Sequence, residues 1–350
     1  MRTYDKKVVK AGAITFVTAL FLLILLPAAL VTVWNAVEDR GGTTARQEQT
    51  FDGGQQAVQQ PGSIDSDAIR VAVFRTQTQT VEEIPLEDYV LGVTASEMPA
   101  SFHIEALRAQ AVAARTYALA KVEKSASGNP QAHPQAPLCD DTHCQVFRTE
   151  KELLQIKGQA WMDDREAGLP QVKQAVQTTK GQVMYYQGEL VQQPLFHSAS
   201  GERTENSEDV FTASVPYLRS VESGEYEDGA YEGETVSVGL SEFIKKAAAQ
   251  DGAAAGAASD TIRILSRSEG GRVERMQVGG ATFSGREIRE LFGLRSANFT
   301  VEISAAQITF TTFGNGHGVG MSQYGANGMG QAGNDYRQIL GHYYSGIEVK

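Results

Sequence analysis

The longest apolar stretch of the chain spans residues 11–34 and contains no charged residue. About 20 apolar residues suffice to cross the hydrocarbon core of a bilayer. Four basic residues precede the stretch, namely Arg2, Lys6, Lys7 and Lys10. The positive-inside rule then predicts a cytoplasmic tail over 1–10, a transmembrane anchor over 11–35, and the rest of the chain outside the cell membrane. The alternative is a cleaved signal peptide, whose apolar core is normally shorter.

Residues 36–65 are rich in Gly, Gln, Thr and Ser and offer little apolar surface to bury. Such a composition predicts a flexible tether between the anchor and a folded region. The folded region is expected to occupy 66–350.

Within 66–350 the apolar residues form short segments of two kinds, some alternating as in strands and others spaced as in helices. Alternation predicts strands over 69–76, 80–84, 261–267, 272–278, 299–303 and 307–313, and a hairpin that joins 182–186 to 190–197. Helical spacing predicts helices over 86–93, 101–124, 151–157, 170–179, 236–249 and 284–291, and again towards the end of 314–345. Because helices and strands mix without a regular βαβ order, the predicted fold class is α+β.

Glu97 lies where two of these helices meet. The following Pro99 disfavours helical backbone in the residue before it, and Ser101 is a candidate N-cap for the next helix. One face of that helix carries Ile104, Leu107, Ala111, Ala114 and Ala118. A carboxyl group at the mouth of a packed helix pair is half-buried, and burial raises its pKa towards the range that suits a general acid. The alternative is a solvated glutamate in a loop.

Composition and charge narrow the classes of function. The chain has 350 residues, of which 41% are hydrophobic and 21% are charged, as in ordinary globular proteins. Its formal charge of −11 argues against a nucleic-acid partner.

Both cysteines fall in one irregular segment that also holds two histidines. His133, Cys139, His143 and Cys144 have the side chains that zinc prefers, although their spacing matches no standard zinc finger. We expect His133, Cys139 and Cys144 as ligands, with His143 or a solvent or ligand atom as the fourth. A Cys139–Cys144 disulfide is the main alternative on the oxidising side of a membrane. Two unpaired thiols are a third reading.

Two polar segments are candidate sugar-binding loops. The first, 196–206, follows a strand and contains Ser200. The second, 314–326, is rich in glycine, which lets backbone approach a ligand closely. It carries His317, Ser322, Gln323 and Tyr324. Structural turns at strand ends have a similar composition, so both readings stay open.

The motifs exclude some enzyme classes and leave others. No Gly-x-Ser-x-Gly elbow of a serine hydrolase is present, and no His-Glu-x-x-His helix of a zinc protease. Glycan cleavage by Glu97 fits the polar loops near by. A non-catalytic wall-binding scaffold fits the anchor and tether equally well.

Four motifs closely resemble the stage II sporulation protein D family. They are IPLEDYV at 84–90, ASEMP at 95–99, ALRAQAVAARTY at 106–117 and HGVGMSQYGA at 317–326. The resemblance covers about 65–350 in the right order, and the N-terminal anchor fits it. It implies a membrane-anchored lytic transglycosylase that degrades peptidoglycan during engulfment of the forespore in endospore-forming bacteria.

The resemblance also implies roles for particular residues. Glu97 would protonate the glycosidic oxygen between N-acetylmuramic acid and N-acetylglucosamine, then take a proton from the muramic 6-hydroxyl as a 1,6-anhydro ring closes. Arg115 would stabilise a sugar substituent or hold Glu97. Zinc would occupy the Cys139/Cys144 loop in a structural role.

The same resemblance implies a substrate and partners. The substrate would be glycan stripped of stem peptides by a partner amidase, and the second partner would be a multispanning membrane protein of the same complex. A zinc-dependent wall hydrolase and a binding scaffold remain the alternatives.

Overall fold

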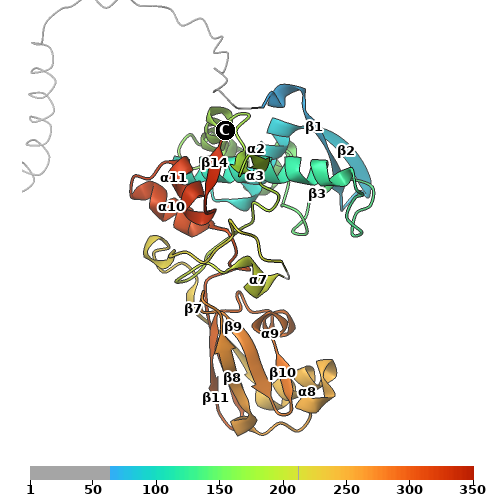
Figure 1. Ribbon diagram of the computed structural model, residues 1–350, viewed down its shortest axis with the longest axis vertical. Helices are drawn as coiled ribbons and strands as arrows, with labels where there is room; N and C mark the ends of the chain where they lie inside the picture. Colours follow the sequence, from blue (N-terminus) through green and yellow to red (C-terminus); the bar gives the residue numbers. More distant parts are fainter. Residues whose placement is uncertain (1–63, 212) are drawn as a thin grey trace, which may run out of the picture. The chain divides into compact units, whose positions relative to one another are not determined.

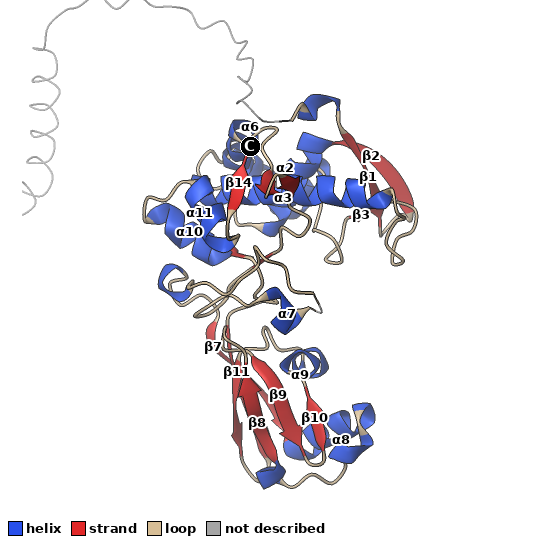
Figure 2. Ribbon diagram, viewed as in Figure 1, coloured by secondary structure: helices blue, strands red, loops and turns tan. Residues whose placement is uncertain are grey.

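The computed structural model describes residues 64–211 and 213–350 (Figures 1 and 2). The predicted tail and anchor, and almost all of the tether, lie outside the described residues. No helix within the described ranges is long and apolar enough to cross a membrane. The described residues mix helices with small sheets, so they confirm the predicted α+β class.

Helices make up most of the first half and the C-terminal end of the described chain. They are α2 (Leu86–Glu97), α3 (Ile104–Ser125), α4 (Glu150–Lys157), α5 (Gln159–Asp163), α6 (Leu169–Thr178), α7 (Ser207–Val210), α8 (Leu240–Gln250), α9 (Gly285–Phe292), α10 (Gln323–Gln331) and α11 (Tyr336–Tyr343). A capping box, for which Ser284 and Glu287 have the expected residue types and spacing, opens α9, where the Ser284 side chain accepts from Glu287 N–H.

The strands pair into small sheets. They are β1 (Arg70–Arg75), β2 (Thr80–Pro85), β3 (Leu138–Cys139), β4 (Met184–Tyr186), β5 (Glu189–Leu190), β6 (Phe196–His197), β7 (Glu232–Gly239), β8 (Ile262–Arg267), β9 (Val273–Val278), β10 (Ala281–Phe283), β11 (Phe299–Ile303), β12 (Gln307–Phe313), β13 (Met321–Ser322) and β14 (Ile347–Val349). Their orders are β2-β1-β3, β14-β4-β5, β13-β6, β11-β12-β7 and β10-β9-β8. The strands predicted over 69–76, 80–84, 261–267, 272–278, 299–303 and 307–313 are confirmed, and they form the antiparallel pairs β1/β2, β8/β9 and β11/β12.

Helix α3 is the central element of the first core. The sequence predicts one buried face, whereas the structure buries almost every side of the helix between Ala106 and Ala118. Alanines make this possible, because small side chains let α2, α6, α10 and α11 approach α3 closely. Even Gln110, Arg115 and Thr116 are buried.

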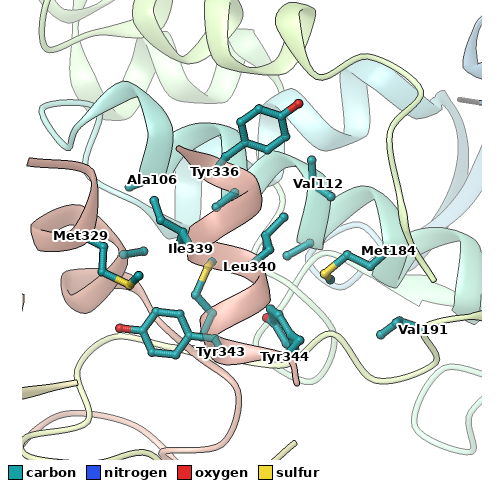
Figure 3. Packing of buried hydrophobic residues seen from close by; sticks show 14 of the residues in the cluster. Ala106, Val112, Met184, Val191, Met329, Tyr336, Ile339, Leu340, Tyr343 and Tyr344 are labelled. Carbon is teal, nitrogen blue, oxygen red and sulfur yellow. The ribbon is translucent and has the colours of Figure 1, made fainter. Parts of the chain in front are cut away.

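The C-terminal helices complete this core. Figure 3 shows Ile339 and Leu340 of α11 packed with Ala106 and Val112 of α3, with Met184 close by. Segments more than 200 residues apart in sequence thus share one apolar cluster. The position of α3 therefore depends on both ends of the described chain.

Residues 232–313 enclose a separate apolar cluster. It draws only on the sheets β11-β12-β7 and β10-β9-β8, the helices α8 and α9, and their connections. Phe243, Phe292 and Phe310 stack at its centre, with ring centroids 4.9–5.9 Å apart. In sequence, residues 199–231 lead into this region, and residues 314–322 lead from it to α10.

The sequence misplaces several boundaries. Ser101 is not the N-cap of α3, because a turn from Pro99 to Phe102 delays the helix. His103 caps it instead, its Nδ1 accepting from Glu105 N–H at 3.4 Å. The short helix predicted over 86–93 continues to Glu97.

Two strand assignments also need correction. Residues 236–239, predicted as helix, belong to strand β7, whose alternating Val236 and Val238 pair with β12. The helix there starts only at Leu240. In the predicted 182–197 hairpin, β4 pairs with the two-residue β5, while β6 pairs in parallel with β13.

Candidate active site and metal cluster

Glu97 is the last residue of α2, and its side chain is half-buried. Extended backbone at Met98 ends the helix immediately before Pro99. The loop after Cys144 presses on the preceding turn of α2 at Gly92. A Cβ at Gly92 would lie 2.4 Å from the Arg148 carbonyl oxygen and 2.5 Å from the Phe147 ring. Only glycine therefore lets this loop reach the helix that carries Glu97.

The loop holds the Glu97 carboxyl directly. The backbone N–H of Val146 donates to Oε1 of Glu97 at 2.6 Å. Burial raises the pKa of Glu97 from its ordinary value of 4.5, and the Val146 hydrogen bond offsets only part of this effect. No described residue hydrogen-bonds Oε2. The position suits a group that holds and releases a proton.

The structure brings the four predicted metal ligands together. The ligand atoms of His133, Cys139, His143 and Cys144 all lie within 4.8 Å of one another. His133 Nε2 is 3.1 Å from His143 Nδ1 and 3.3 Å from Cys144 Sγ. In tetrahedral zinc sites, bonds of about 2.0–2.3 Å place ligand atoms roughly 3.5 Å apart. The cluster therefore has the composition and spacing to hold such an ion.

Two further features prepare the cluster for a metal. His133 Nδ1 lies 2.8 Å from the Ala136 carbonyl oxygen, which leaves the Nε2 lone pair to face the cluster. The hydrogen bond from Cys144 lowers the pKa of Cys139 to about 5, so a thiolate is available as a ligand. The same pairing raises the pKa of Cys144. Both cysteines are free thiols, so the structure has no Cys139–Cys144 disulfide.

The cluster loop is tied to strand β1 through Asp140. Thr76 donates to Asp140 Oδ1 from its N–H and its hydroxyl, at 2.9 and 2.8 Å. Arg75 Nε lies 3.4 Å from the other oxygen. Buried carboxylates need such partners. The loop that contacts Glu97 is therefore fixed at both the cluster and the sheet.

Tyr117, on α3, is a residue to which the sequence assigned no role. Its hydroxyl hydrogen-bonds the Cys144 sulfur, and burial raises its pKa. Tyr89 of α2 donates to Gln145 Oε1 at 3.4 Å. These contacts join both central helices to the cluster loop, and only the tertiary arrangement reveals them.

Arg115 does not lie beside Glu97. Its guanidinium makes a two-pronged ion pair with Glu87, at 2.9 and 2.7 Å, and donates to the Gln182 carbonyl at 3.0 Å. Glu87 and Glu97 stand ten residues apart on α2, a rise of about 15 Å. Arg115 is fully buried, so the geometry gives it a bracing role between helices instead of contact with a sugar.

Ser200 and Ser322, predicted to bind substrate, are instead buried around Glu227. Glu227 accepts from the N–H groups of Ser200 and Gly201 at 2.9 Å, and from the hydroxyls of Ser223 and Ser322 at 2.6 Å. The Ser200 hydroxyl also lies 2.7 Å from His197 Nε2, but its complete burial keeps it from acting as a nucleophile. This network locks the two polar segments together.

The other three predicted substrate residues differ in exposure. Gln323 is buried and bonds Gln110 of α3 at 3.3 Å. His317 is half-buried, and its Nδ1 accepts from Val319 N–H at 3.0 Å. Tyr324 is half-buried and packs edge-on against Phe102, in the turn that follows Glu97, with ring centroids 4.9 Å apart. Tyr324 thus contacts the α2–α3 turn.

Taken together, fold and site define an α+β protein with one half-buried acid beside a two-cysteine, two-histidine cluster. A family model described as stage II sporulation protein matches residues 74–186, a span that holds both Glu97 and the cluster. Stage II sporulation protein D of Bacillus subtilis is 36% identical over 97% of this chain and 96% of its own length. Its counterpart from Bacillus amyloliquefaciens is 36% identical over 94% of this chain and 92% of its own.

The chain belongs to the stage II sporulation protein D family. A more distant relative is the amidase enhancer of Bacillus subtilis, which is 27% identical over 74% of this chain and 40% of its own length.

Proposed function

We propose that this protein is a peptidoglycan lytic transglycosylase that acts on the cell wall during sporulation. It would cleave the bond between N-acetylmuramic acid and N-acetylglucosamine and leave a 1,6-anhydro end. The observation that carries the proposal is the state of Glu97, a half-buried carboxyl with a raised pKa and one oxygen engaged by Val146. Membership of the sporulation family and the amidase enhancer relative support the cell-wall setting.

The Val146 contact favours one oxygen of Glu97 as the proton carrier. When the carboxyl group is protonated, the oxygen that accepts the Val146 N–H acts as the carbonyl oxygen, and this arrangement favours a proton on Oε2. No described residue forms a hydrogen bond with Oε2 of Glu97. This oxygen is therefore the one to donate to a glycosidic oxygen.

A single carboxyl suffices for this reaction. Oε2 donates its proton to the departing oxygen of N-acetylglucosamine as the bond to muramic C1 breaks. The resulting carboxylate takes the proton of the muramic 6-hydroxyl, and O6 bonds to C1. The proton count balances without water, whereas hydrolytic glycosidases use two carboxyl groups. Among the described residues, no second carboxylate bonds Glu97 or contributes to its pKa shift.

Zinc is the metal we assign to the cluster. His133, Cys139, His143 and Cys144 supply four protein ligands, the number typical of closed structural sites. A catalytic zinc keeps an open position for water or substrate, so this ligand set favours a structural role over a zinc hydrolase. When bound, the ion would stiffen the loop whose Val146 N–H holds Glu97.

The apolar N-terminal sequence motivates a proposed location, and the sporulation family and the amidase enhancer relative support proposed partners. We propose that an N-terminal anchor holds the protein in the cell membrane with residues 66–350 outside. Its substrate would be denuded glycan, prepared by a sporulation cell-wall amidase, and a multispanning membrane protein would complete the engulfment complex.

The proposal is tested by product analysis. The full chain, purified in detergent, is incubated with denuded glycan strands, and the products are identified by mass spectrometry. Anhydro-muramic ends support the transglycosylase. Reducing ends would indicate a hydrolase, and unchanged strands that still bind protein would indicate a scaffold.

A further inference from the structure

A cavity of about 330 Å³ lies beside α7, β9 and α9, away from the contacts of Glu97. Its lining includes Glu205, Phe211, Arg272, Arg286, Arg289 and His317. Part of its wall is apolar and is formed by Val210, Phe211, Val273 and Ala297. The cavity is therefore partly apolar, with a group of guanidinium side chains on one side.

Most charges that line the cavity are already paired or exposed. Arg272 is buried and lies 3.3 Å from Glu205, which is also buried. Arg286 pairs with Glu290 at 2.9 Å, and both are exposed. Asp209 and Glu274 are exposed at the surface, where water screens them.

Arg289 is the lining cation whose terminal amino groups these pairs leave without an acceptor. Its Nε donates to the Leu294 carbonyl oxygen at 3.2 Å, and no described residue accepts from its two terminal amino groups. The side chain is half-buried, and burial together with the charges of Arg272 and Arg286 lowers its pKa, an effect that the charge of Glu290 offsets only in part. A half-buried cation beside two like charges is stabilised by an anion.

His317 adds no charge to the cavity. Burial and the nearby Arg272 and Arg289 lower its pKa to about 4, so it is neutral at pH 7. Its ring packs edge-on against Phe211 with centroids 5.7 Å apart. The two ring faces give the cavity apolar surface against which a sugar ring or a methyl group can pack.

We infer that this cavity binds a single oxyanion group carried on a saccharide, with the two terminal amino groups of Arg289 as donors. A guanidinium binds a carboxylate or a phosphate through two parallel hydrogen bonds. The lactyl group of N-acetylmuramic acid ends in a free carboxylate once its peptide is removed, whereas N-acetylglucosamine has none. A phosphate-bearing wall polymer offers the same chemistry. The assignment to a wall saccharide rests on the proposed function, but the anion site does not.

The test measures binding of small probes to the full chain by ligand-observed NMR at constant ionic strength. The probes are N-acetylmuramic acid, N-acetylglucosamine and inorganic phosphate. The variants are Arg289→Gln, Arg289→Lys and, as a matched control, Arg263→Gln at an exposed position on β8. The Lys variant keeps the charge and guards against a folding defect, which melting curves would report.

We expect N-acetylmuramic acid to bind and N-acetylglucosamine not to bind. Arg289→Gln should raise the dissociation constant about tenfold or more, Arg289→Lys less, and Arg263→Gln not at all. Phosphate binding that depends on Arg289, without binding of N-acetylmuramic acid, would support the anion site and overturn the carboxylate assignment. Equal binding of both sugars, or binding that ignores Arg289, would overturn the inference.

These probes contain no glycosidic bond between sugars, so their binding is independent of turnover. Failure of the anion site and failure of the transglycosylase proposal are thus distinguishable.

Discussion

The backbone N–H of Val146 donates to Oε1 of Glu97 at 2.6 Å, and Val146 follows Cys144 by only two residues. The group that we propose as the acid is therefore held by the same loop that contributes half of the metal cluster. Loss of the metal or of a ligand should therefore shift the Val146 N–H and alter how the Glu97 carboxyl group is held.

Loss of a metal ligand should weaken both stability and activity. We expect the purified protein to carry about one zinc, and Cys139→Ser or Cys144→Ser to lose it. Metal binding energy contributes to folding, so these variants should also melt at a lower temperature. Activity should fall about 10–100-fold, the loss typical when groups that orient a site are removed. Metal analysis, melting curves and product assays check this.

The control for that experiment is Thr142→Ala, an exposed position between the ligands. It should keep both the metal and the activity. A metal-free wild type with an oxidised Cys139–Cys144 pair would reject the zinc assignment.

Stability should depend on pH through Glu97. Because burial raises the pKa of Glu97, the folded state binds its proton more tightly than the unfolded state does. Stability from this source is then full at low pH and is lost as the pH rises through the folded pKa. We expect Glu97→Gln to melt at or above the wild-type temperature at pH 7, with the difference shrinking as the pH falls through the raised pKa of folded Glu97 towards 4.5. Melting curves from pH 4 to 8 measure this, with the exposed Glu189→Gln as control. A Glu97→Gln variant that melts lower than wild type at pH 7 would contradict it.

Arg115 should act on stability more than on chemistry. Arg115→Lys keeps the charge but cannot make both hydrogen bonds to Glu87. We expect it to destabilise the fold by about 1–3 kcal/mol, with activity retained well below the melting temperature. Glu87→Gln should cost a similar amount, and the double variant less than the sum of the two. An Arg115→Lys protein of normal stability but without activity would instead indicate that Arg115 acts directly on the sugar or on Glu97.

Glu227 should be essential for locking the two polar segments together. Four donors converge on its buried carboxylate. Glu227→Gln replaces one acceptor oxygen by a donor, so at least one of these bonds becomes unfavourable. We expect a loss of about 2–4 kcal/mol, measured by denaturant unfolding. The exposed Glu225→Gln, two residues away, should change stability by less than about 0.5 kcal/mol.

The sequence alone predicts the strongly patterned elements and the metal cluster. Hairpin β8/β9 follows from alternation around a Gly-Gly turn, and α9 from the Ser284 capping box. The four ligands lie within 12 residues, so short spacing is enough to bring them together. Glu97 can be placed at the end of a helix from the sequence alone, because the nearby Pro99 is a local signal for a helix end.

What the sequence could not predict depends on tertiary contacts. Residues 236–239 become strand because β12 lies beside them, which local propensity does not report. Ser200 and Ser322 have the polar character of ligand-binding residues, and only the buried Glu227 between them reveals their structural role. The family resemblance implied that Arg115 stabilises a sugar substituent or holds Glu97, yet the helix pairing directs its guanidinium to Glu87.

The central claim is that Glu97 transfers the proton, and Glu97→Gln tests it most directly. Glutamine keeps the shape and the Val146 hydrogen bond but has no proton to donate at Oε2. General acid–base catalysis contributes about 10²–10⁴-fold, and Glu97 serves as acid and then as base, so the loss should reach the top of that range. The measurement is the rate of release of anhydro-muramic products from denuded glycan by the full chain, with Glu105→Gln and Glu205→Gln compared as alternative acids. We expect a folded Glu97→Gln protein that still binds glycan and releases almost no product, whereas release near the wild-type rate would show that another group carries the proton.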